Sequence, residues 1–314
     1  HVASIVRIAI TYLKLQRLTS SGLQISDRPV SLTALDGKFD HFYMKALDGF
    51  LMIISKNGEI IYATDNVVFH LGIAQVDMIG HSIFDLTHPC DHDDIRDLIT
   101  DKRRHSIASG ANSDTRPHYD FFVRMKSNYL SKANFSTFKS SSYRVVHCCG
   151  HTMPVNDNDL LPCVVLTGQL IPHPSICDLH LDSHTFVTHH NLDMTITYCD
   201  QQIYSLLGYK LEQLIGKSLF LFHHALDGEL LEKAFRTLFA KGQVLTGPYR
   251  FMAYGGGYCW LNTQATLVHN SSAADKAQRI ICVNNVISNI EEKDLVLSEV
   301  QLLPVADEAE SRTC

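Results

Sequence analysis

The run GHSIF, from Gly80 to Phe84, returns as GKSLF from Gly216 to Phe220. The match extends from Leu71/Leu207 to Asp91/Asp227, and eight positions are identical at one constant offset of 136 residues without a gap. Solenoid repeats have periods of about 20 to 50 residues, so a repeat this long is not a solenoid unit. The sequence therefore predicts two copies of one domain, each of which buries its own core.

The composition is that of a globular protein with reduced thiols. The chain has 314 residues, of which 45% are hydrophobic. A net charge of −6 and a pI near 6.3 provide no overall basic surface for nucleic acid or an anionic membrane. The nine cysteines include the adjacent pair Cys148-Cys149, a pattern typical of free thiols in the cytosol or nucleus. No apolar run approaches the roughly 20 residues of a membrane span, so we expect a soluble intracellular protein.

Each copy is expected to contain strands, short helices, one longer helix and then further strands. In the first copy the strands are expected at residues 50–54, 59–63, 121–125, 143–148 and 163–170, and the short helices at 65–70 and 75–79. In the second copy the strands are expected at 194–198, 249–253, 258–268 and 280–288, and the short helices at 202–207 and 211–215. Asp91 and Asp227 are expected to cap the longer helices. This order predicts an α+β fold, in which helices cover one face of an antiparallel sheet.

An amphipathic helix is expected at residues 2–18, and Ser20-Ser21-Gly22 is expected to end it. No N-cap precedes this helix, so we expect it to be the back end of a longer motif. Apolar side chains that a single helix leaves uncovered indicate a protein interface. We expect this interface to include Ile5, Ile8, Tyr12 and Leu13, together with Tyr258 and Trp260 from the solvent face of a later strand.

Several motifs resemble the basic helix-loop-helix PAS transcription factors of the hypoxia-inducible factor α type. Gly80 to His92 and Arg124-Met125-Lys126 resemble their first PAS domain, and His224 to Asp227 and Thr263 to Thr266 resemble the second. The resemblance covers nearly the whole chain and implies two tandem PAS domains, each with a five-stranded antiparallel sheet. The implied layout is the truncated second helix of the helix-loop-helix at 1–19, PAS-A at 41–171, a linker at 172–183, PAS-B at 184–290 and a flexible tail at 291–314.

The resemblance implies the α-class subunit of a heterodimeric, hypoxia-responsive transcription factor located in the nucleus and the cytoplasm. The implied partner is a basic helix-loop-helix PAS protein of the aryl hydrocarbon receptor nuclear translocator class. The implied DNA target is the hypoxia-response element, bound through a basic region upstream of His1. We expect no enzymatic activity, no cofactor and no membrane association. The alternatives are a single-minded or trachealess-type developmental factor, a ligand-gated PAS sensor, and a bacterial-type PAS sensor coupled to a kinase.

In the resembling proteins, the inner face of the second PAS domain surrounds a small, partly hydrated pocket. The matching positions here are His190, Met194, Ile196, His223, Phe235, Thr246, Tyr249, Thr263 and Asn284. Buried polar side chains need hydrogen-bond partners, so a pocket with ordered water and a small-molecule ligand is one interpretation. The other is a packed core in which these groups bind one another.

Two further groups of residues carry weaker indications. His88, Cys90 and His92 have a spacing that suits a metal ion, but the second copy retains only the first of the three, so a structural role is favoured and we expect no metal site. No nucleophile elbow or phosphate-binding glycine-rich loop occurs either. The triplet Lys102-Arg103-Arg104 lies in a long polar stretch. A solvated loop is its simpler interpretation, and contact with DNA phosphates is the alternative.

Overall fold

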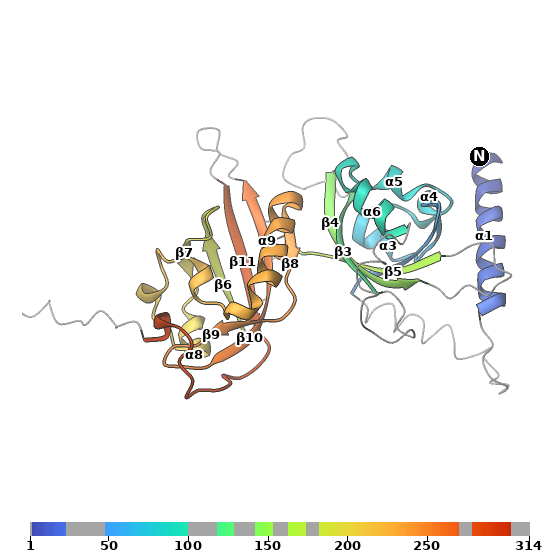
Figure 1. Cartoon of the computed structure of the whole chain (residues 1–314). Coiled ribbons are helices and arrows are strands. Elements are labelled where there is room, and N and C mark those ends of the chain that lie inside the picture. Colours follow the sequence, from blue (N-terminus) through green and yellow to red (C-terminus); the bar gives the residue numbers. More distant parts are fainter. Residues whose placement is uncertain are drawn as a thin grey trace, which may run out of the picture. The chain divides into compact units, whose positions relative to one another are not determined.

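The computed structural model describes residues 2–22, 48–99, 118–128, 142–152, 163–173, 182–269 and 278–302. It divides into two compact units, His1–Leu170 and Ile171–Cys314 (Figure 1). Each unit contains its own antiparallel sheet, with helices packed against it. The predicted α+β fold with two tandem domains is therefore confirmed.

The first unit has a five-stranded sheet in the order β2-β1-β5-β4-β3. Its strands are β1 (Phe50–Ser55), β2 (Ile60–Ala63), β3 (His118–Ser127), β4 (Ser142–Thr152) and β5 (Cys163–Leu170). A tight turn joins β1 to β2, and Gly58 adopts a φ of +79° there, as the Asn57-Gly58 pair predicts. All five predicted strands of this copy are present, and β3 and β4 are longer than predicted.

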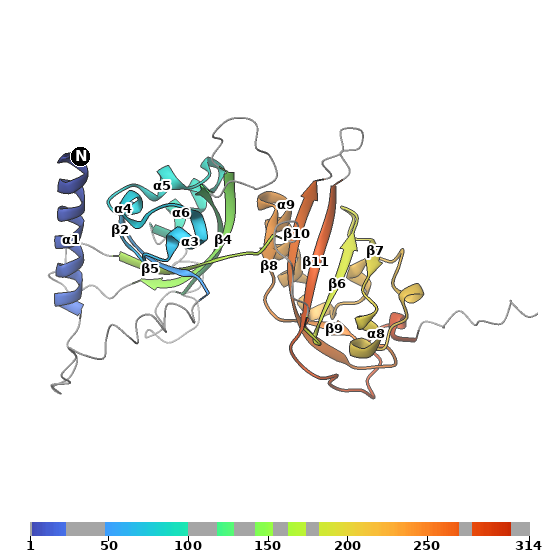
Figure 2. The same ribbon diagram turned by 180° about the vertical axis from the view of Figure 1, so that it is seen from behind.

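Short helices cover the inner face of this sheet (Figure 2). They are α3 (Val67–Leu71), α4 (Gln75–Met78), α5 (Ile83–Leu86), the 3-10 helix η1 (Pro89–Asp91) and α6 (His92–Ile99). Apolar side chains of the helices, such as Leu71 and Met78, share one buried core with Met52 and Val146 of the sheet. Burial of these side chains, each worth about 1.5 to 3 kcal/mol, holds helices that are too short to be stable alone.

The second unit repeats this plan. Its sheet has the order β7-β6-β11-β10-β8, and β9 also pairs with β10. The strands are β6 (Thr185–His190), β7 (Ile196–Cys199), β8 (Gln243–Leu245), β9 (Tyr249–Met252), β10 (Tyr258–His269) and β11 (Gln278–Val286). The helices are α8 (Gln202–Leu207), α9 (Gly228–Lys241) and the 3-10 helices η2 (Leu211–Gln213), η3 (Leu219–Leu221), η4 (Ala225–Asp227) and η5 (Glu299–Leu302).

Two strands of the second unit, β6 and β8, lie outside the predicted elements. Polar residues on the buried side of β6 hide its alternation, and β8 has only three residues. The five strands that the family resemblance implies become six, because β8 and β9 both pair with β10, along different parts of the strand. Gly247-Pro248 interrupts this edge, since proline has no N–H to donate to a neighbouring strand.

The first helix, α1 (Val2–Gly22), includes the Ser20-Ser21-Gly22 triplet. The helix is described as far as Gly22, the last residue of the triplet, so it extends four residues beyond the predicted range. Two serines lower helix propensity by only a few tenths of a kcal/mol each, so they do not stop a helix on their own.

A carboxylate at the start of the longer helix joins the helical segment to the sheet in both units. Asp91 accepts hydrogen bonds from the backbone N–H of Arg124 at 2.7 Å and from the Arg124 guanidinium at 2.6 Å. Asp227 and Arg250 repeat both bonds, at 2.8 and 2.7 Å. We call each pair an Asp–Arg clamp. Burial opposes the charge of Asp227, but the hydrogen bonds and the charge of Arg250 hold the pKa of this carboxyl below its usual value.

The predicted helix caps at these aspartates are not formed as expected. Asp227 makes no side-chain cap bond, because its carboxylate binds the neighbouring strand, and Asp91 lies within η1. Histidines three residues earlier instead cap the 3-10 helices η1 and η4, which precede the longer helices. The Nδ1 atoms of His88 and His224 accept the backbone N–H groups of Cys90 and Leu226, each at 3.2 Å. These positions, identical in both copies, therefore serve the fold.

The segment from 291 to 302 packs onto the second unit, which corrects the prediction of a flexible tail beginning at residue 291. Gln301 is fully buried, and its amide donates to the carbonyls of Ala253 and Gly257 at 3.0 and 2.8 Å. Its side-chain oxygen accepts the backbone N–H groups of Leu297 and Ser298. The Gln301 side chain thus satisfies the backbone carbonyls of the turn that precedes β10. Its hydrogen bonds also hold the segment after β11 against this turn. The rest of the predicted tail lies outside the described residues.

The Asp–Arg clamp of the second unit can be compared with an exposed ion pair in the same unit. We expect Asp227→Ala to lower the free energy of unfolding by about 2 to 4 kcal/mol, because Arg250 loses its charge-assisted partner in a partly buried site. Glu232→Ala, which removes a solvent-exposed pair with Arg236, should cost less than about 1 kcal/mol. Urea unfolding followed by the fluorescence of Trp260, the only tryptophan, reports on this unit. An equal loss of unfolding free energy in the two variants would show that the clamp stabilises the domain no more than an exposed ion pair does.

Candidate functional site

Helix α1 has two opposite faces. One carries Ile5, Val6, Ile10, Tyr12 and Leu13, whose side chains are between 49% and 67% exposed. We call these five residues the apolar stripe. The other carries Arg7, Ile8, Thr11, Lys14 and Leu15, which are half-buried or buried. At about 100° per residue, the two sets lie on opposite sides of the helix.

Contacts with the first unit determine which face of α1 remains outward. Arg7 lies directly over Gly80, where an added Cβ atom would clash with the Arg7 side chain. Lys14 forms an ion pair with Glu59, and Thr11 is fully buried. Gly80 thus provides both a left-handed backbone, with a φ of +75°, and the space that the helix needs.

The structure divides the helix residues that we predicted to form an interface. Ile5, Tyr12 and Leu13 belong to the apolar stripe. Ile8 does not: it is half-buried on the docked face, which also carries Arg7 and Thr11. The place of Ile8 at a partner interface stays a prediction.

The predicted aromatic patch on β10 is largely covered by the chain itself. Tyr258 is only 9% exposed, and Trp260 is half-buried. The Arg250 guanidinium lies 5.7 and 5.3 Å from the centroids of these two rings. Trp260 Nε1 donates to the Glu291 carboxylate at 3.3 Å, and the backbone of Glu291 pairs with that of Tyr258. The predicted exposure of Tyr258 is wrong, because the sequence alone did not show that residue 291 returns to this strand, and a partner contact at Trp260 stays a prediction.

The interior of the second unit contains a chain of hydrogen bonds. Tyr249 Oη and Thr263 Oγ1 are 2.8 Å apart, and Thr263 donates to Asn284 Oδ1 at 2.8 Å. Asn284 Nδ2 donates to Thr188 Oγ1 at 3.0 Å, and Thr188 Oγ1 lies 2.8 Å from His190 Nε2. Thr246 joins by accepting the backbone N–H of Thr263. These side chains are all at least 95% buried. The packed core that we considered as an alternative is therefore realised at these positions.

The geometry determines which group donates in each of these hydrogen bonds. The carbonyl oxygen of Met194 lies 3.4 Å from His190 Nδ1 and can only accept, so Nδ1 carries the proton. His190 Nε2 is then an acceptor, and the Thr188 hydroxyl donates to it. Every donor from Tyr249 to His190 finds an acceptor if His190 is neutral. Burial lowers the pKa of His190 to about 4, which agrees with a neutral ring.

Thr188 is absent from the predicted pocket residues, although it joins two of them. Its position follows from β6, which the sequence did not predict. Alternation along that strand places Phe186, Thr188 and His190 on the buried side. Had the strand been recognised, the same alternation would have indicated Thr188.

The remaining predicted pocket residues occupy two places. Met194 and Ile196 are buried near His190, whose ring contacts the Met194 carbonyl. His223 and Phe235 instead line an open groove of about 380 Å³ along α9. Phe220, Glu232, Arg236 and Phe239 complete most of its wall. The predicted pocket residues therefore do not converge on one cavity, and a small-molecule ligand stays a prediction.

The side chains of His88, Cys90 and His92 do not gather as a metal site. His88 caps η1, and the His92 ring packs edge-on against Phe84 at 5.1 Å between centroids. The basic triplet Lys102, Arg103 and Arg104 lies outside the described residues. No helix among the described residues is long and apolar enough to cross a membrane.

Two family comparisons match the two units. The family described as PAS fold matches residues 40–171, and a second family, also described as PAS fold, matches residues 196–284. Both units are PAS domains.

Curated relatives extend the similarity to nearly the whole chain. Hypoxia-inducible factor 1-alpha from Eospalax fontanierii baileyi is 40% identical over 98% of this chain, and the protein from Mus musculus is 39% identical over 98%. "Protein similar" from Drosophila melanogaster is 38% identical over 85% of the chain. The chain covers only 38%, 37% and 18% of the lengths of these three relatives. Among solved structures, the PAS-B domain of Cycle from Drosophila melanogaster aligns with 32% of this chain at 21% identity and a TM-score of 0.30.

The neutral state of His190 predicts how the stability of the second unit depends on pH. The pKa of His190 is about 4 in the folded state and about 6.5 when unfolded. The unfolded state therefore binds more protons between these values, and the free energy of unfolding falls as the pH is lowered from 6.5 towards 4. We expect His190 to contribute up to about 3 kcal/mol to this fall.

The His190→Gln variant keeps a polar side chain without a titrating ring and should flatten the dependence. The matched control is His184→Gln, at an exposed position in the same unit. Urea unfolding at several pH values, followed by Trp260 fluorescence, measures the difference. If both variants retain the slope of the unmodified protein, His190 is not the titrating group.

Proposed function

Because this chain belongs to the hypoxia-inducible factor α family of tandem PAS proteins, we propose that it is the dimerisation segment of an α-class subunit of a heterodimeric, hypoxia-responsive transcription factor. Its function is recognition rather than catalysis. Helix α1 and the two PAS domains bind a second basic helix-loop-helix PAS protein, of the aryl hydrocarbon receptor nuclear translocator class. The heterodimer then acts on DNA in the nucleus.

The observation that carries this proposal is the apolar stripe of α1. A helix that packed only on the first PAS domain would need one apolar face, but α1 has a second, which carries five large apolar side chains. The contacts of Arg7 and Lys14 with the first unit keep that face outward. Helix-loop-helix proteins dimerise through a parallel four-helix bundle, in which such a stripe is buried between helices. The stripe therefore fits a helical partner better than solvent.

The charge of the chain supports an indirect role in DNA binding. With a net charge of −6, the segment has no overall attraction for the phosphate backbone. We therefore propose that contact with the hypoxia-response element is made by a basic region on the same polypeptide, positioned by the heterodimer. The basic triplet Lys102, Arg103 and Arg104 would add a secondary phosphate contact.

Substitutions on the apolar stripe test this function. We expect Ile5→Asp and Leu13→Asp each to weaken binding of an aryl hydrocarbon receptor nuclear translocator-class partner by at least about tenfold. Each variant loses the burial of a large apolar side chain, worth about 1.5 to 3 kcal/mol, and places a charge in the interface. Surface plasmon resonance with the immobilised partner measures the dissociation constant.

Ser4→Asp is the matched control, because it adds the same charge to an exposed position on the same helix outside the stripe. Circular dichroism confirms that all three variants remain folded. Unchanged affinity of both stripe variants, with folding intact, would exclude α1 from the interface and contradict the proposed function.

A further inference from the structure

The outer face of β3 and β4 carries a cluster of side chains that the proposed function does not use. The two strands pair in the register Asp120↔Cys149 and Phe122↔His147. Neighbouring residues alternate across the sheet, so these four side chains share one face, while Cys148 is buried on the other. Asp120 is exposed, and His147 and Cys149 are half-buried. The cluster is therefore accessible to solvent from the outside of the sheet.

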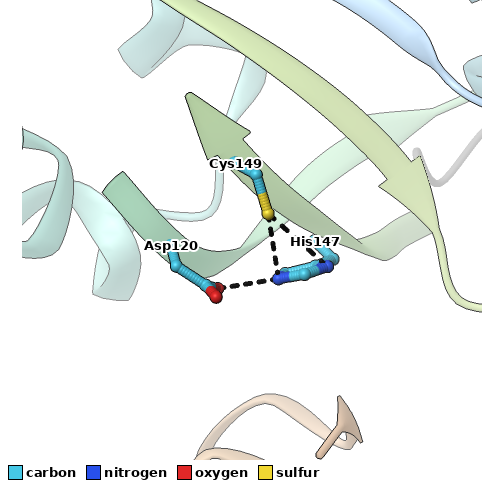
Figure 3. Close-up of side chains that lie close together, drawn as sticks. All are labelled: Asp120, His147 and Cys149. Carbon is cyan, nitrogen blue, oxygen red and sulfur yellow. Dashed lines mark hydrogen bonds and ion pairs between the residues drawn. The ribbon is translucent and has the colours of Figure 1, made fainter. Parts of the chain in front are cut away.

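Three different ligand types converge there (Figure 3). His147 Nε2 lies 2.7 Å from Asp120 Oδ1 and 3.4 Å from Cys149 Sγ. One donor atom from each of the three residues lies within 4.8 Å of the other two. The imidazole is held in place because it stacks on Phe122, with 4.6 Å between ring centroids and 19° between planes. The arrangement is preformed on two strands of a sheet, which position side chains more rigidly than a loop does.

A Cys-His-Asp catalytic relay does not fit this geometry. Such a relay uses one ring nitrogen toward the nucleophile and the other toward the carboxylate. Here the same nitrogen, Nε2, is the closer one to the Cys149 sulfur and also faces the Asp120 carboxylate. A single nitrogen cannot take a proton from the thiol while it donates one to the carboxylate. Three donor atoms within 4.8 Å of one another are instead the arrangement of a candidate metal site.

We propose that Asp120, His147 and Cys149 form a binding site for a Zn²⁺ ion. Imidazole nitrogen, thiolate sulfur and carboxylate oxygen are the three ligand types that zinc takes in proteins. Zinc bond lengths of about 2.0 to 2.3 Å imply tetrahedral edges of about 3.5 Å between N and S and about 3.4 Å between N and O. The N···S distance of 3.4 Å already matches. The N···O distance of 2.7 Å must open by about 0.7 Å, and the exposed Asp120 side chain can rotate to allow this.

The site has a structural consequence. β3 is the edge strand of the first sheet, and β4 is its neighbour. An ion bound by Asp120 from β3 and by His147 and Cys149 from β4 links the two strands. Three protein ligands leave the fourth tetrahedral position to water, so the site is open to solvent and the bound ion can exchange with free ions. The inference does not rest on the proposed function, because no residue of the cluster belongs to α1.

Titration of the full 314-residue chain with CoCl₂ tests the site, since Co²⁺ reports a bound thiolate through a ligand-to-metal charge-transfer band. We expect the band to appear with a stoichiometry of one and to disappear when ZnCl₂ displaces the cobalt. Cys149→Ser should abolish the band, and Asp120→Asn should weaken Co²⁺ binding at least about tenfold. Cys90→Ser, at an exposed cysteine elsewhere in the same unit, is the matched control and should leave the band unchanged.

A second measurement separates loss of the site from loss of the fold. ZnCl₂ should raise the melting temperature of the unmodified chain and of Cys90→Ser, because the ion binds the folded state. It should not raise that of Cys149→Ser or Asp120→Asn. The proposal is overturned if the charge-transfer band is absent from the unmodified chain. It is equally overturned if the band and the zinc-dependent stabilisation persist in Cys149→Ser.

Discussion

The Asp–Arg clamp is the interaction on which the rest of each domain depends. In both units it joins the end of a series of short helical turns to a strand of the sheet, through the guanidinium and the backbone N–H of one arginine. The same strand residue also accepts the backbone N–H of His88 or His224, so the segment before the helix is bound along the strand. Helical turns of three to six residues have little stability of their own. The clamp therefore fixes where the longer helix begins and which side chains it directs into the core.

Two copies of one fold have been adapted to different tasks. Gly80 and Gly216 have nearly the same left-handed φ, +75° and +81°. Arg7 of α1 occupies the space beside Gly80, but among the described residues nothing beyond the chain neighbours lies within 4 Å of a Cβ position at Gly216. One glycine thus serves only its turn, whereas the other also admits a helix. The first domain binds one face of α1 and so keeps the apolar stripe outward. The second contains a buried series of hydrogen bonds that ends at His190.

The sequence repeat made much of the fold predictable, and the contacts that it did not reveal were missed for physical reasons. A constant offset of 136 identified Asp91 and Asp227 as structural but could not identify their partners, since Arg124 and Arg250 are 126 residues apart (250 minus 124). Thr263, which was expected in the interior of the second domain, is buried there. The sequence alone could not show that Glu291 returns over Tyr258, or that the register of β3 and β4 places Asp120 beside Cys149. Contacts between segments far apart in sequence were missed, and so were the histidine caps, whereas most strands and short helices were found.

The central claim is that α1 is held on the first PAS domain by one face so that the other can bind a partner. Nuclear magnetic resonance of methyl groups, with a soluble paramagnetic probe, measures the solvent exposure of each face directly. On addition of an aryl hydrocarbon receptor nuclear translocator-class partner, the methyl groups of Ile5, Ile10 and Leu13 should become protected from the probe. Those of Ile8 and Leu15 should already be shielded in the free chain and change little. Protection confined to Ile8 and Leu15, or no protection of the stripe in a saturated complex, would contradict the account.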